Sequence, residues 1–463
     1  RAMPERCPTC HTEEFHQEED VLDTWFSSWL WPFSVFGWPE NSRDLQHFYP
    51  TDALVTGPDI IFFWVARMIM SGLEFMGDIP FKDVYFTSII RDEQGRKLSK
   101  SLNNSPDPIQ VVDKYGADAL RFTLIYIAPM GQDIRYSNEK CEIGRNFANK
   151  LWNAVRFRLQ QGAVSDTWAD LSDLSGELVR PDDRWILARA DATVRGITEA
   201  LDEFHFHEMA RVLYEFVWNE FCDWYLESAK AVFNQGSDNE KKTTLRVFDH
   251  VVSIILRLLH PLMPFVTEEL YHQAGFATAD ESIMQAAWPL PFGSARSEKL
   301  GLSVKLVKSV DAKFELIRGV RNVRASYLIP ANRKIDIVLA PKSADLVDFL
   351  TRDTLSLKAL LYASDVVIDP DYQPKGPTGI AVGEMGTAYV PLGGIIDVEA
   401  EVQRLEKQER ETQGFMDKAQ RKLANESFVT KAPEEVVDLE RKRLTDLQDK
   451  LQRIREQLES LRS

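Results

Sequence analysis

Residues 54–68 read LVTGPDIIFFWVARM, and this stretch decides the fold of the first part of the chain. Apolar, strand-like positions lead into a polar turn, and an apolar run with helical spacing follows over about 60–75. Asp59 stands where a helix N-cap is expected. A second strand-like run lies at 84–86. A strand, a helix and a strand with short links predict a parallel α/β layer.

Helical patterns dominate from residue 137 to residue 276, with polar breaks at 164–183 and 234–241. A linker containing two prolines follows at 289–291. The next stretch predicts a small α+β module made of helices at 302–327 and 344–362, strands at 335–340, 366–368 and 388–390, and Gly-rich turns at 376–386 and 393–394.

The last 68 residues carry two heptad patterns. Apolar and small residues recur from 398 to 423 and again from 444 to 461, with steps of three and four. Between them, residues 425–433 read NESFVTKAP, which suits a turn. This spacing predicts an antiparallel coiled-coil hairpin.

Composition excludes several classes of protein. The chain has 463 residues with a hydrophobic fraction of 44%, enough for several folded domains, and four cysteines, which fit a reducing cytoplasm rather than a disulfide scaffold. No apolar run is long enough to span a bilayer. The net charge of −16 argues against indiscriminate nucleic-acid binding. Residues 85–160 nevertheless hold 12 Lys and Arg against 8 Asp and Glu, a local basic track where a polyanion could bind.

Residues 96–104 read RKLSKSLNN and form the motif richest in chemistry. Lys97 and Lys100 can neutralise phosphate oxygens, while the hydroxyls of Ser99 and Ser101 can donate hydrogen bonds to them. A solvated basic loop is the alternative explanation. Asn adopts a left-handed backbone more readily than most residues, so Asn103 can occupy a tight position in this loop.

The motif resembles the Lys-Met-Ser-Lys-Ser signature of class I aminoacyl-tRNA synthetases, with Leu98 in the place of Met. Other stretches look like the valyl branch of that family, namely DTWFSSWLWP (23–32), VTGPDIIFFWVARM (55–68), YGADALRF (115–122), GQDIR (131–135), RNFANKLWN (145–153) and WNEFCDWY (218–225). The resemblance runs from about residue 20 to residue 463. It implies ATP-dependent activation of valine, with Mg²⁺ accompanying the nucleotide, and transfer of valine to tRNA(Val) by an enzyme that is monomeric when intact.

The resemblance also implies roles for single residues. Lys97, Ser99 and Lys100 would stabilise the pyrophosphate leaving group, an electrostatic role. Ser101, Gly57 and Asp59 would complete the ATP and adenylate site, as expected outside the carboxyl ends of parallel strands.

A tight apolar pocket is needed for valine selection, because one methylene changes binding by only ~1–3 kcal/mol. Trp25, Ile60 and Trp64 are the residues expected to form it, and the resemblance points to the same three. Two tryptophans at such spacing also suit an ordinary core, which is the competing interpretation.

Two groups of residues are expected to bind tRNA. One helical stripe combines cations, amides and aromatic rings, a mixture suited to single-stranded RNA; it comprises Arg145, Asn149, Trp152, Asn153, Arg156 and Phe157. Packing of this helix into a bundle would explain Trp152 equally well. The second group lies near the turn of the hairpin, where the resemblance implies contact with the outer corner of the tRNA; it comprises Lys418, Arg421, Lys422 and Lys431.

Cys7 and Cys10 form a Cys-x-x-Cys pair near the start of the sequence. Tetrahedral zinc needs four ligands, so the pair supplies half of a zinc-ribbon site. The resemblance places a second pair upstream in related enzymes, so zinc is expected in the intact enzyme rather than in this chain.

These patterns divide the chain into a half zinc-ribbon-like segment (1–20), the C-terminal part of a Rossmann-type catalytic domain (21–136), a helical-bundle anticodon-binding domain (137–292), a small α+β module (300–395) and a coiled-coil tRNA-binding arm (396–463). The fold class is therefore multidomain α/β plus all-α.

None of the eight histidines lies in the His-x-Gly-His order of the first family signature. We therefore expect this chain to correspond to the C-terminal half of such an enzyme, without the editing domain and inactive by itself. We also expect its partial parallel sheet to leave an apolar face uncovered. Two alternatives stay open, a non-catalytic tRNA-binding protein derived from a synthetase and another branched-aliphatic synthetase.

Overall fold

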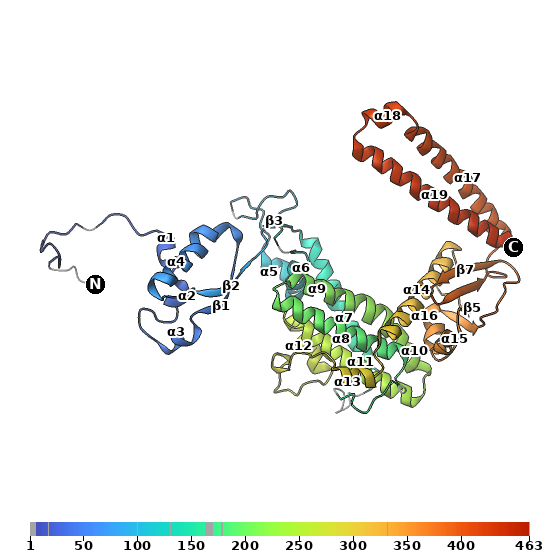
Figure 1. The fold of residues 1–463 in the computed structure, drawn as a ribbon, viewed down its shortest axis with the longest axis horizontal. Coiled ribbons are helices and arrows are strands. Elements are labelled where there is room, and N and C mark those ends of the chain that lie inside the picture. The colour runs from blue at the N-terminus through green and yellow to red at the C-terminus, as the bar shows by residue number, and fades with distance from the viewer. Residues whose placement is uncertain are drawn as a thin grey trace. The chain divides into compact units, whose positions relative to one another are not determined.

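The computed structural model describes residues 6–16, 18–99, 101–129, 131–162, 170–176, 179–330 and 332–462. The chain forms two compact units (Figure 1). The first unit takes its described residues from 1–114, 123–142 and 200–208, and the second takes the remainder, from residue 115 to the C-terminus. Among the described residues, no helix combines the length and the apolar character needed to cross a bilayer.

The first unit contains a parallel pair of strands, β1 (Thr51–Thr56) and β2 (Phe81–Phe86), in which Leu54 lies opposite Val84. Its buried core joins the strands to the helix between them, through Leu54, Val65, Met68 and Phe81. The accompanying helices are α1 (Thr24–Ser28), α2 (Trp31–Ser34), α3 (Arg43–Phe48) and α4 (Ala66–Phe75). The predicted parallel strand–helix–strand arrangement is confirmed.

The start of this helix differs from the prediction. A 3₁₀ turn, η1 (Pro58–Ile60), and a π-helical segment, η2 (Ile61–Val65), precede α4. Asp59 lies inside the 3₁₀ turn, so its assignment as the N-cap is wrong. Pro58 at the first helical position starts the turn without a side-chain cap, and the Asp59 carboxylate pairs with Lys97 instead.

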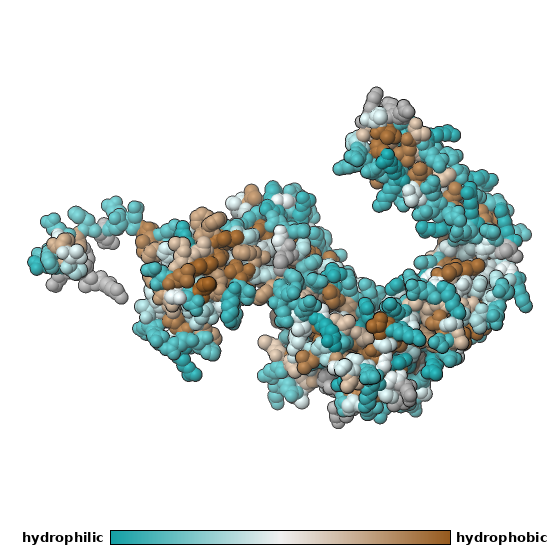
Figure 2. Space-filling view, in the orientation of Figure 1, coloured by the Kyte–Doolittle hydropathy of each residue, from teal (hydrophilic) through white to brown (hydrophobic). Residues whose placement is uncertain are grey.

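Apolar side chains gather on the exposed surface of the first unit (Figure 2). Phe62 is 81% exposed, Met70 66% and Val55 60%, all on or beside the β1–α4–β2 layer. Such a surface on a soluble domain usually marks an interface. Exposure of an apolar face was expected from the sequence.

Shorter elements continue the chain. The strands β3 (Ile90–Arg91) and β4 (Ile134–Arg135) pair in parallel, and between them lie α5 (Pro108–Tyr115) and α6 (Ala117–Tyr126). A 3₁₀ turn, η3 (Asn138–Lys140), precedes the first helix of the bundle.

Most of a helical bundle belongs to the second unit. It comprises α7 (Cys141–Leu159), α8 (Pro181–Asp202), α9 (Phe206–Glu215), η4 (Phe216–Leu226), α10 (Glu227–Gln235), α11 (Asp238–Leu259), α12 (Pro264–Gln273), η5 (Ile283–Gln285) and α13 (Ser294–Lys299). The polar breaks predicted at 164–183 and 234–241 each overlap a helix boundary in the described residues, since α8 starts at Pro181, α10 ends at Gln235 and α11 starts at Asp238. Ser237 and Glu240 form a capping box at the start of α11.

A four-stranded sheet follows α14 (Val304–Ser326). Its order is β6–β5–β8–β7, with β5 (Ile335–Pro341) parallel to β6 (Ala363–Ile368) and β8 (Gly386–Pro391) antiparallel to both β5 and β7 (Thr378–Gly383). The stretch 376–386, predicted as a turn, contains β7. Gly379 lies in this strand because Val323 and Tyr327 of the α14 segment pack closely against its backbone.

The predicted helix at 344–362 is two helices, α15 (Ala344–Thr351) and α16 (Thr354–Leu361). The break falls at Asp353, which is only 3% exposed and whose carboxylate binds Lys313 of α14. This long-range contact fixes Asp353 in a non-helical conformation.

At the C-terminal end, α17 (Val398–Leu423) and α19 (Glu434–Arg462) run antiparallel, side by side (Figure 1). Two of the ion pairs between them are Arg455–Glu409, at 2.8 Å, and Arg462–Glu406, at 2.5 Å. Seven of the buried side chains fall on the predicted heptad positions, namely Leu405, Thr412, Ala419, Leu451, Ile454, Leu458 and Leu461, whereas Glu401, Val437 and Glu440 are buried outside them. The predicted turn between them contains a further short helix, α18 (Glu426–Lys431). We call residues 398–462 the arm.

Candidate active site and nucleic-acid interface

Residues 96–104, the signature loop, leave β3 through a tight turn. Asp92 holds this turn, because its carboxylate accepts hydrogen bonds from the backbone N–H and the Nε of Arg96, both at 2.8 Å. Arg91 and Lys97 form an antiparallel bridge across the turn. The signature loop therefore starts from a fixed base.

Asn104 ties the two ends of the signature loop together. Its Oδ1 accepts a hydrogen bond from the Ser99 backbone N–H at 2.8 Å, and its Nδ2 donates to Asp92 Oδ2 at 3.0 Å and to the Lys97 carbonyl at 3.3 Å. The hydrogen bond from Asn104, together with those from Arg96, lowers the pKa of Asp92 to about 2. Asp92 is thus an anionic anchor for the loop.

Lys97 extends from the signature loop to the carboxyl end of β1. Its Nζ lies 2.7 Å from Asp59 Oδ2, and this hydrogen bond lowers the pKa of Asp59. Gly57 precedes Asp59 at the strand end, where a Cβ atom would lie 2.6 Å from the Asp59 carboxylate. The structure therefore brings together Gly57, Asp59 and Lys97, all predicted for one site.

The hydroxyl groups of Ser99 and Ser101 lie 3.2 Å apart, and Ser99 Oγ accepts a hydrogen bond from the Leu102 backbone N–H at 3.2 Å. Asn103 has a φ of +50°, in the left-handed region that asparagine tolerates. Lys100, predicted as catalytic, lies outside the described residues. An open cavity of about 540 Å³ adjoins the loop and is lined by polar side chains that include Glu93, Asn103 and Glu139.

The three residues predicted for the valine pocket lie in three elements, Trp25 in α1, Ile60 in η1 and Trp64 in η2. The Trp64 indole stacks on Trp31, with ring centroids 5.6 Å apart, and its Nε1 donates to the Ser28 carbonyl at 3.1 Å. Trp64 also packs on the core of the first unit. Trp25 stacks on Phe63 at 5.8 Å, and Ile60 is half-buried. Trp64 therefore contributes to the core, as the competing interpretation of the sequence holds.

The stripe predicted on α7 is partly open to solvent. Asn149, Asn153 and Arg156 are exposed, and Trp152 is half-buried. The flanking members have aromatic neighbours: the Arg145 guanidinium lies 5.6 Å from the Tyr115 ring centre, and Phe157 packs on Phe233 at 6.0 Å. Two amides and one guanidinium thus remain accessible along a single helix face.

The cations predicted near the end of the arm differ in their surroundings. Lys422 forms an ion pair with Glu440 of α19 at 2.8 Å, so part of its charge is neutralised. Arg421 is exposed, and Lys418 lies 5.8 Å from the Phe415 ring centre. The side chain of Lys431 lies outside the described residues.

Cys7 and Cys10 lie in one tight turn. Hydrogen bonds from the Cys10 and Thr9 backbone, and from the Cys10 side chain, lower the pKa of the Cys7 thiol to about 7. In the described part of the chain, no group of three or more His, Cys, Asp or Glu side chains could hold a metal ion. Two thiols alone do not complete a tetrahedral zinc site.

Asp92 and Asn104 were not assigned a role from the sequence. The available signal was an Asp three residues before Gly95, a common turn pattern, followed by an Asn beyond the lysines. The pattern predicts a turn but not the hydrogen bond between two side chains that lie twelve residues apart.

Three family models match the chain. "tRNA synthetases class I (I, L, M and V)" matches residues 3–137, "Anticodon-binding domain of tRNA ligase" matches 183–339, and "Valyl tRNA synthetase tRNA binding arm" matches 397–462. Valine–tRNA ligase from Enterococcus faecalis is 42% identical over 453 residues, which is 98% of this chain and 50% of the relative. The enzyme from Thermotoga maritima is 42% identical over 457 residues, covering 99% and 50% of the two chains.

The chain belongs to the valyl-tRNA synthetase family. It spans about half the length of the curated relatives that it matches. The valyl-tRNA synthetase match includes the signature loop, the α7 stripe and the arm, because the aligned region extends over almost the whole chain. Among solved structures, a LeuRS–tRNA–LeuAMS complex from Agrobacterium radiobacter aligns over 72% of this chain and 36% of its own, with 19% identity and a TM-score of 0.49.

Proposed function

We propose that this chain forms part of a valine–tRNA ligase, which activates valine with ATP and transfers it to tRNA(Val). The observation that carries the proposal is the meeting of Lys97, Asp59 and Gly57 at the carboxyl end of β1. This is where nucleotides bind in parallel α/β folds. The chemistry of a basic, hydroxyl-rich loop at that position suits a triphosphate.

In the activation step, the valine carboxylate attacks the α-phosphorus of ATP, and pyrophosphate leaves with the bonding electrons. Lys97, Ser99 and Lys100 would stabilise the negative charge that builds on the leaving group, with Ser101 completing the loop. Mg²⁺ would accompany the ATP phosphates. Lys97 is available for this role because its pair with Asp59 is about half exposed and is therefore weak.

Asp59 would then be free to bind the amino group or ribose of the adenylate, beside the open backbone at Gly57. The apolar side chains of Trp25, Ile60 and Trp64 would select valine. The role of Trp64 in the core and its role in the pocket are compatible, since an indole can pack through one face and present its edge.

Two surfaces would bind tRNA(Val). The α7 stripe, from Arg145 to Phe157, has the amides and aromatic rings that recognise unstacked bases. The arm would act as a coiled-coil hairpin that contacts the outer corner of the tRNA through Lys418, Arg421, Lys422 and Lys431. The segment boundaries at 20, 136, 292 and 395, a monomeric state and zinc bound through Cys7 and Cys10 in the full-length enzyme belong to the same proposal.

Titration of this chain with tRNA(Val) at low salt tests the RNA-binding part. We expect binding whose logarithm falls linearly with the logarithm of salt concentration, and deletion of residues 397–463 should weaken binding and reduce that slope. Arg421→Ala should reduce the slope by about one, and Lys422→Ala by less, because Lys422 is paired with Glu440. An unchanged slope after deletion would contradict the role of the arm.

Valine-dependent exchange of pyrophosphate into ATP tests the catalytic part, in an enzyme of full family length that contains these residues. Lys100→Ala should lower the exchange rate ~10²–10³-fold and leave tRNA affinity within a few-fold. Exchange that does not depend on valine would refute the substrate assignment. The chain of 463 residues has no His-x-Gly-His sequence and should show no exchange alone.

A further inference from the structure

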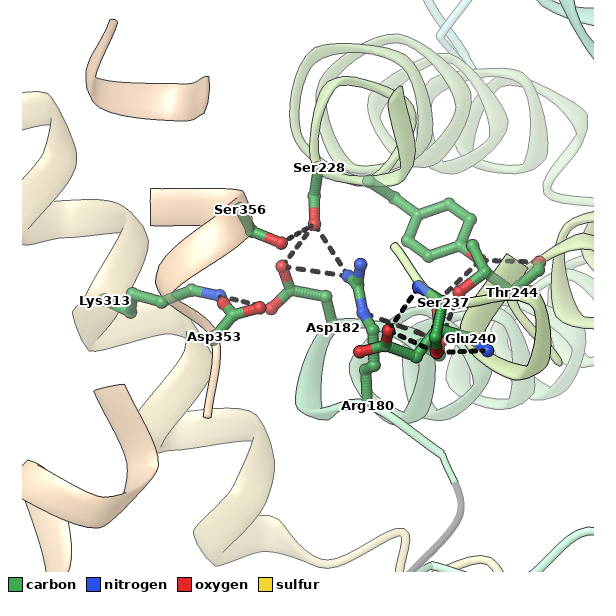
Figure 3. A network of polar contacts seen from close by, with 11 residues as sticks. Arg180, Asp182, Ser228, Ser237, Glu240, Thr244, Lys313, Asp353 and Ser356 are labelled. Atoms are coloured by element: carbon green, nitrogen blue, oxygen red, sulfur yellow. Dashed lines mark hydrogen bonds and ion pairs between the residues drawn. The ribbon is translucent and has the colours of Figure 1, made fainter. Parts of the chain in front are cut away.

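A cluster of buried charges lies in the second unit, outside the signature loop and the two proposed RNA-binding surfaces (Figure 3). At its centre is Lys313 of α14, whose side chain is fully buried. Its Nζ donates to Asp182 and to Asp353, and both carboxylates are also buried. Burial would raise the pKa of Asp182, but the charges of Lys313 and Arg180 lower it below its ordinary value. The ammonium and this carboxylate are therefore both ionised in the interior.

The cluster joins parts of the chain that are far apart in sequence. Asp182 lies in the first turn of α8 in the helical bundle, whereas Asp353 separates α15 from α16 beside the sheet. Ser228 of α10 strengthens the link, since its Oγ donates to Asp182 Oδ2 at 2.5 Å and lies 3.0 Å from Ser356 Oγ of α16. The bundle and the sheet module are thus connected through hydrogen bonds that require particular atomic positions.

Burying such charges costs desolvation energy that apolar side chains of similar size would avoid, so the cluster is a poor explanation for stability alone. What charges and hydrogen bonds add is directionality, because the donors and acceptors meet in only one arrangement. We therefore regard the cluster as a feature that fixes the position of the sheet module relative to the helical bundle.

The helix α14 links the buried cluster to the arm. With 23 residues it is about 35 Å long. Near its middle, Phe314 stacks on Trp224 of the bundle, with ring centroids 4.3 Å apart. At its end, the Ser326 carbonyl accepts a hydrogen bond from Arg404 of α17 at 3.4 Å. The same helix therefore contacts both the bundle and the base of the arm.

The other helix of the arm is tied to the same module. Ser460 of α19 donates to the Thr378 carbonyl in β7, the strand whose Gly379 packs closely against α14. Both helices of the arm are thus attached to elements that α14 supports.

We propose that Lys313 is a positioning residue for RNA binding, which fixes the arm relative to the α7 stripe so that both can bind one tRNA molecule. The proposal rests on the proposed function, since it takes both surfaces to bind RNA. Two linked sites bind tightly only when their spacing matches the ligand, because the second contact then forms at high effective concentration. Weakening the connection between the helical bundle and the sheet module should therefore lower the affinity for tRNA, although no residue that contacts RNA is removed.

The first experiment measures, in the absence of RNA, how tightly the arm is held relative to the helical bundle. Spin labels are placed at Lys242 of α11 and Gln448 of α19, both exposed, in a chain with Cys7 and Cys10 changed to Ser; Cys141 and Cys222 are buried. Lys313→Met should broaden the distribution of label distances. Lys308→Met is the matched control, because Lys308 is an exposed lysine of the same helix, and it should leave the distribution unchanged. Equal distributions in all three proteins would overturn the proposal.

The second experiment measures tRNA(Val) affinity in the chain with and without residues 397–463. Lys313→Met should weaken binding about tenfold in the complete chain and by less than twofold once the arm is deleted. An equal loss in both backgrounds would overturn the proposal, since Lys313 would then act on the bundle itself. Absence of tRNA binding by the unaltered chain would instead refute the proposed function. The label distances would still test whether Lys313 fixes the arm relative to the helical bundle.

A second variant addresses the stability of the fold. Lys313→Met/Asp353→Asn removes one positive and one negative charge and leaves Asp182 beside Arg180, at 3.7 Å. It should fold more stably than Lys313→Met and should still broaden the distances. A narrow distribution in this folded variant would show that the ion cluster does not set the geometry.

Discussion

Lys97 and Asp59 are separated by 38 residues in sequence, yet Lys97 Nζ lies 2.7 Å from Asp59 Oδ2. The contact joins the signature loop to the strand end where the adenylate is proposed to bind. Both side chains are about half exposed, so an incoming phosphate can replace the carboxylate at low cost. The ion pair describes a resting position of the lysine beside its proposed substrate.

Lys97→Ala should therefore lower the rate of valine-dependent pyrophosphate exchange ~10²–10³-fold in an enzyme of full family length. Lys82→Ala is the control, because Lys82 forms a similar but more exposed ion pair with Asp52, at 2.8 Å, between β2 and β1. The control should retain its activity. Similar losses in the two variants would contradict a specific role for Lys97.

Asn104 and Asn103 are adjacent but should respond in opposite ways to substitution. Asn104→Ala removes the acceptor of the Ser99 N–H and the link to Asp92, so hydrogen exchange at the Ser99 amide should accelerate about five- to tenfold. Asn103→Gly should be tolerated, because glycine readily adopts the φ of +50°. Unaltered exchange in Asn104→Ala, measured by NMR on this chain, would mean that the loop is held by other contacts.

The hold on the signature loop should depend on pH through Asp92. Its pKa is about 2 in the folded protein and 3.8 ordinarily, so the stabilisation is complete above about pH 4 and is lost as the pH falls toward 2. Exchange at Ser99, corrected for its intrinsic pH dependence, should accelerate below pH 4. In Asp92→Asn it should be fast and flat across the same range, and a persistent dependence there would point to another group.

Arg156→Ala should weaken tRNA(Val) binding about tenfold and reduce the salt slope by about one, since an exposed guanidinium of the α7 stripe is lost. Lys150→Ala on the same helix should change affinity by less than about threefold, because Lys150 is already 2.5 Å from Asp223 and 4.0 Å from the Trp218 ring centre. Fluorescence titrations at several salt concentrations measure both quantities. A larger effect from Lys150 would place the RNA surface on another face of α7.

Arg158→Met should lower the free energy of unfolding by about 3–5 kcal/mol, because it leaves Asp249 buried without its partner. The two side chains are almost fully buried, and Arg158 Nη2 lies 2.6 Å from Asp249 Oδ2. Arg158→Met/Asp249→Leu removes both charges and should recover most of the loss. Urea unfolding followed by tryptophan fluorescence tests this, and a double variant as unstable as the single one would contradict the argument.

The sequence was informative where local pattern and structure agree. The order of strand, helix and strand predicted the parallel pairing of β1 and β2, and helical spacing predicted seven of the buried positions of the arm, because helix and strand patterns depend on neighbours within a few residues. The meeting of Asp59 and Lys97 was expected only through the family resemblance.

Two of the errors share a physical origin, which is contact between residues distant in sequence. Asp353 looked helical, but a lysine 40 residues away holds it outside the helix. Gly379 suggested a turn, but it serves the close approach of α14 to a strand. The hydrogen bond between Asn104 and Asp92 and the packing of Trp64 on Trp31 likewise depend on the folded chain.

The ion cluster around Lys313 also bears on how this chain can be dissected. A cut at the prolines near residue 290 would look harmless in the sequence, yet it would separate Asp182 from Lys313, so that Lys313 would lose one of its two buried carboxylate partners and Asp182 would lose its buried ammonium partner. The helical bundle and the sheet module should therefore melt as one cooperative block, and neither should be expected to keep its native form when produced alone. The boundary between the bundle and the module therefore does not separate two independently folding parts. The arm is attached mainly at its base, so it is the segment best suited to exchange between relatives.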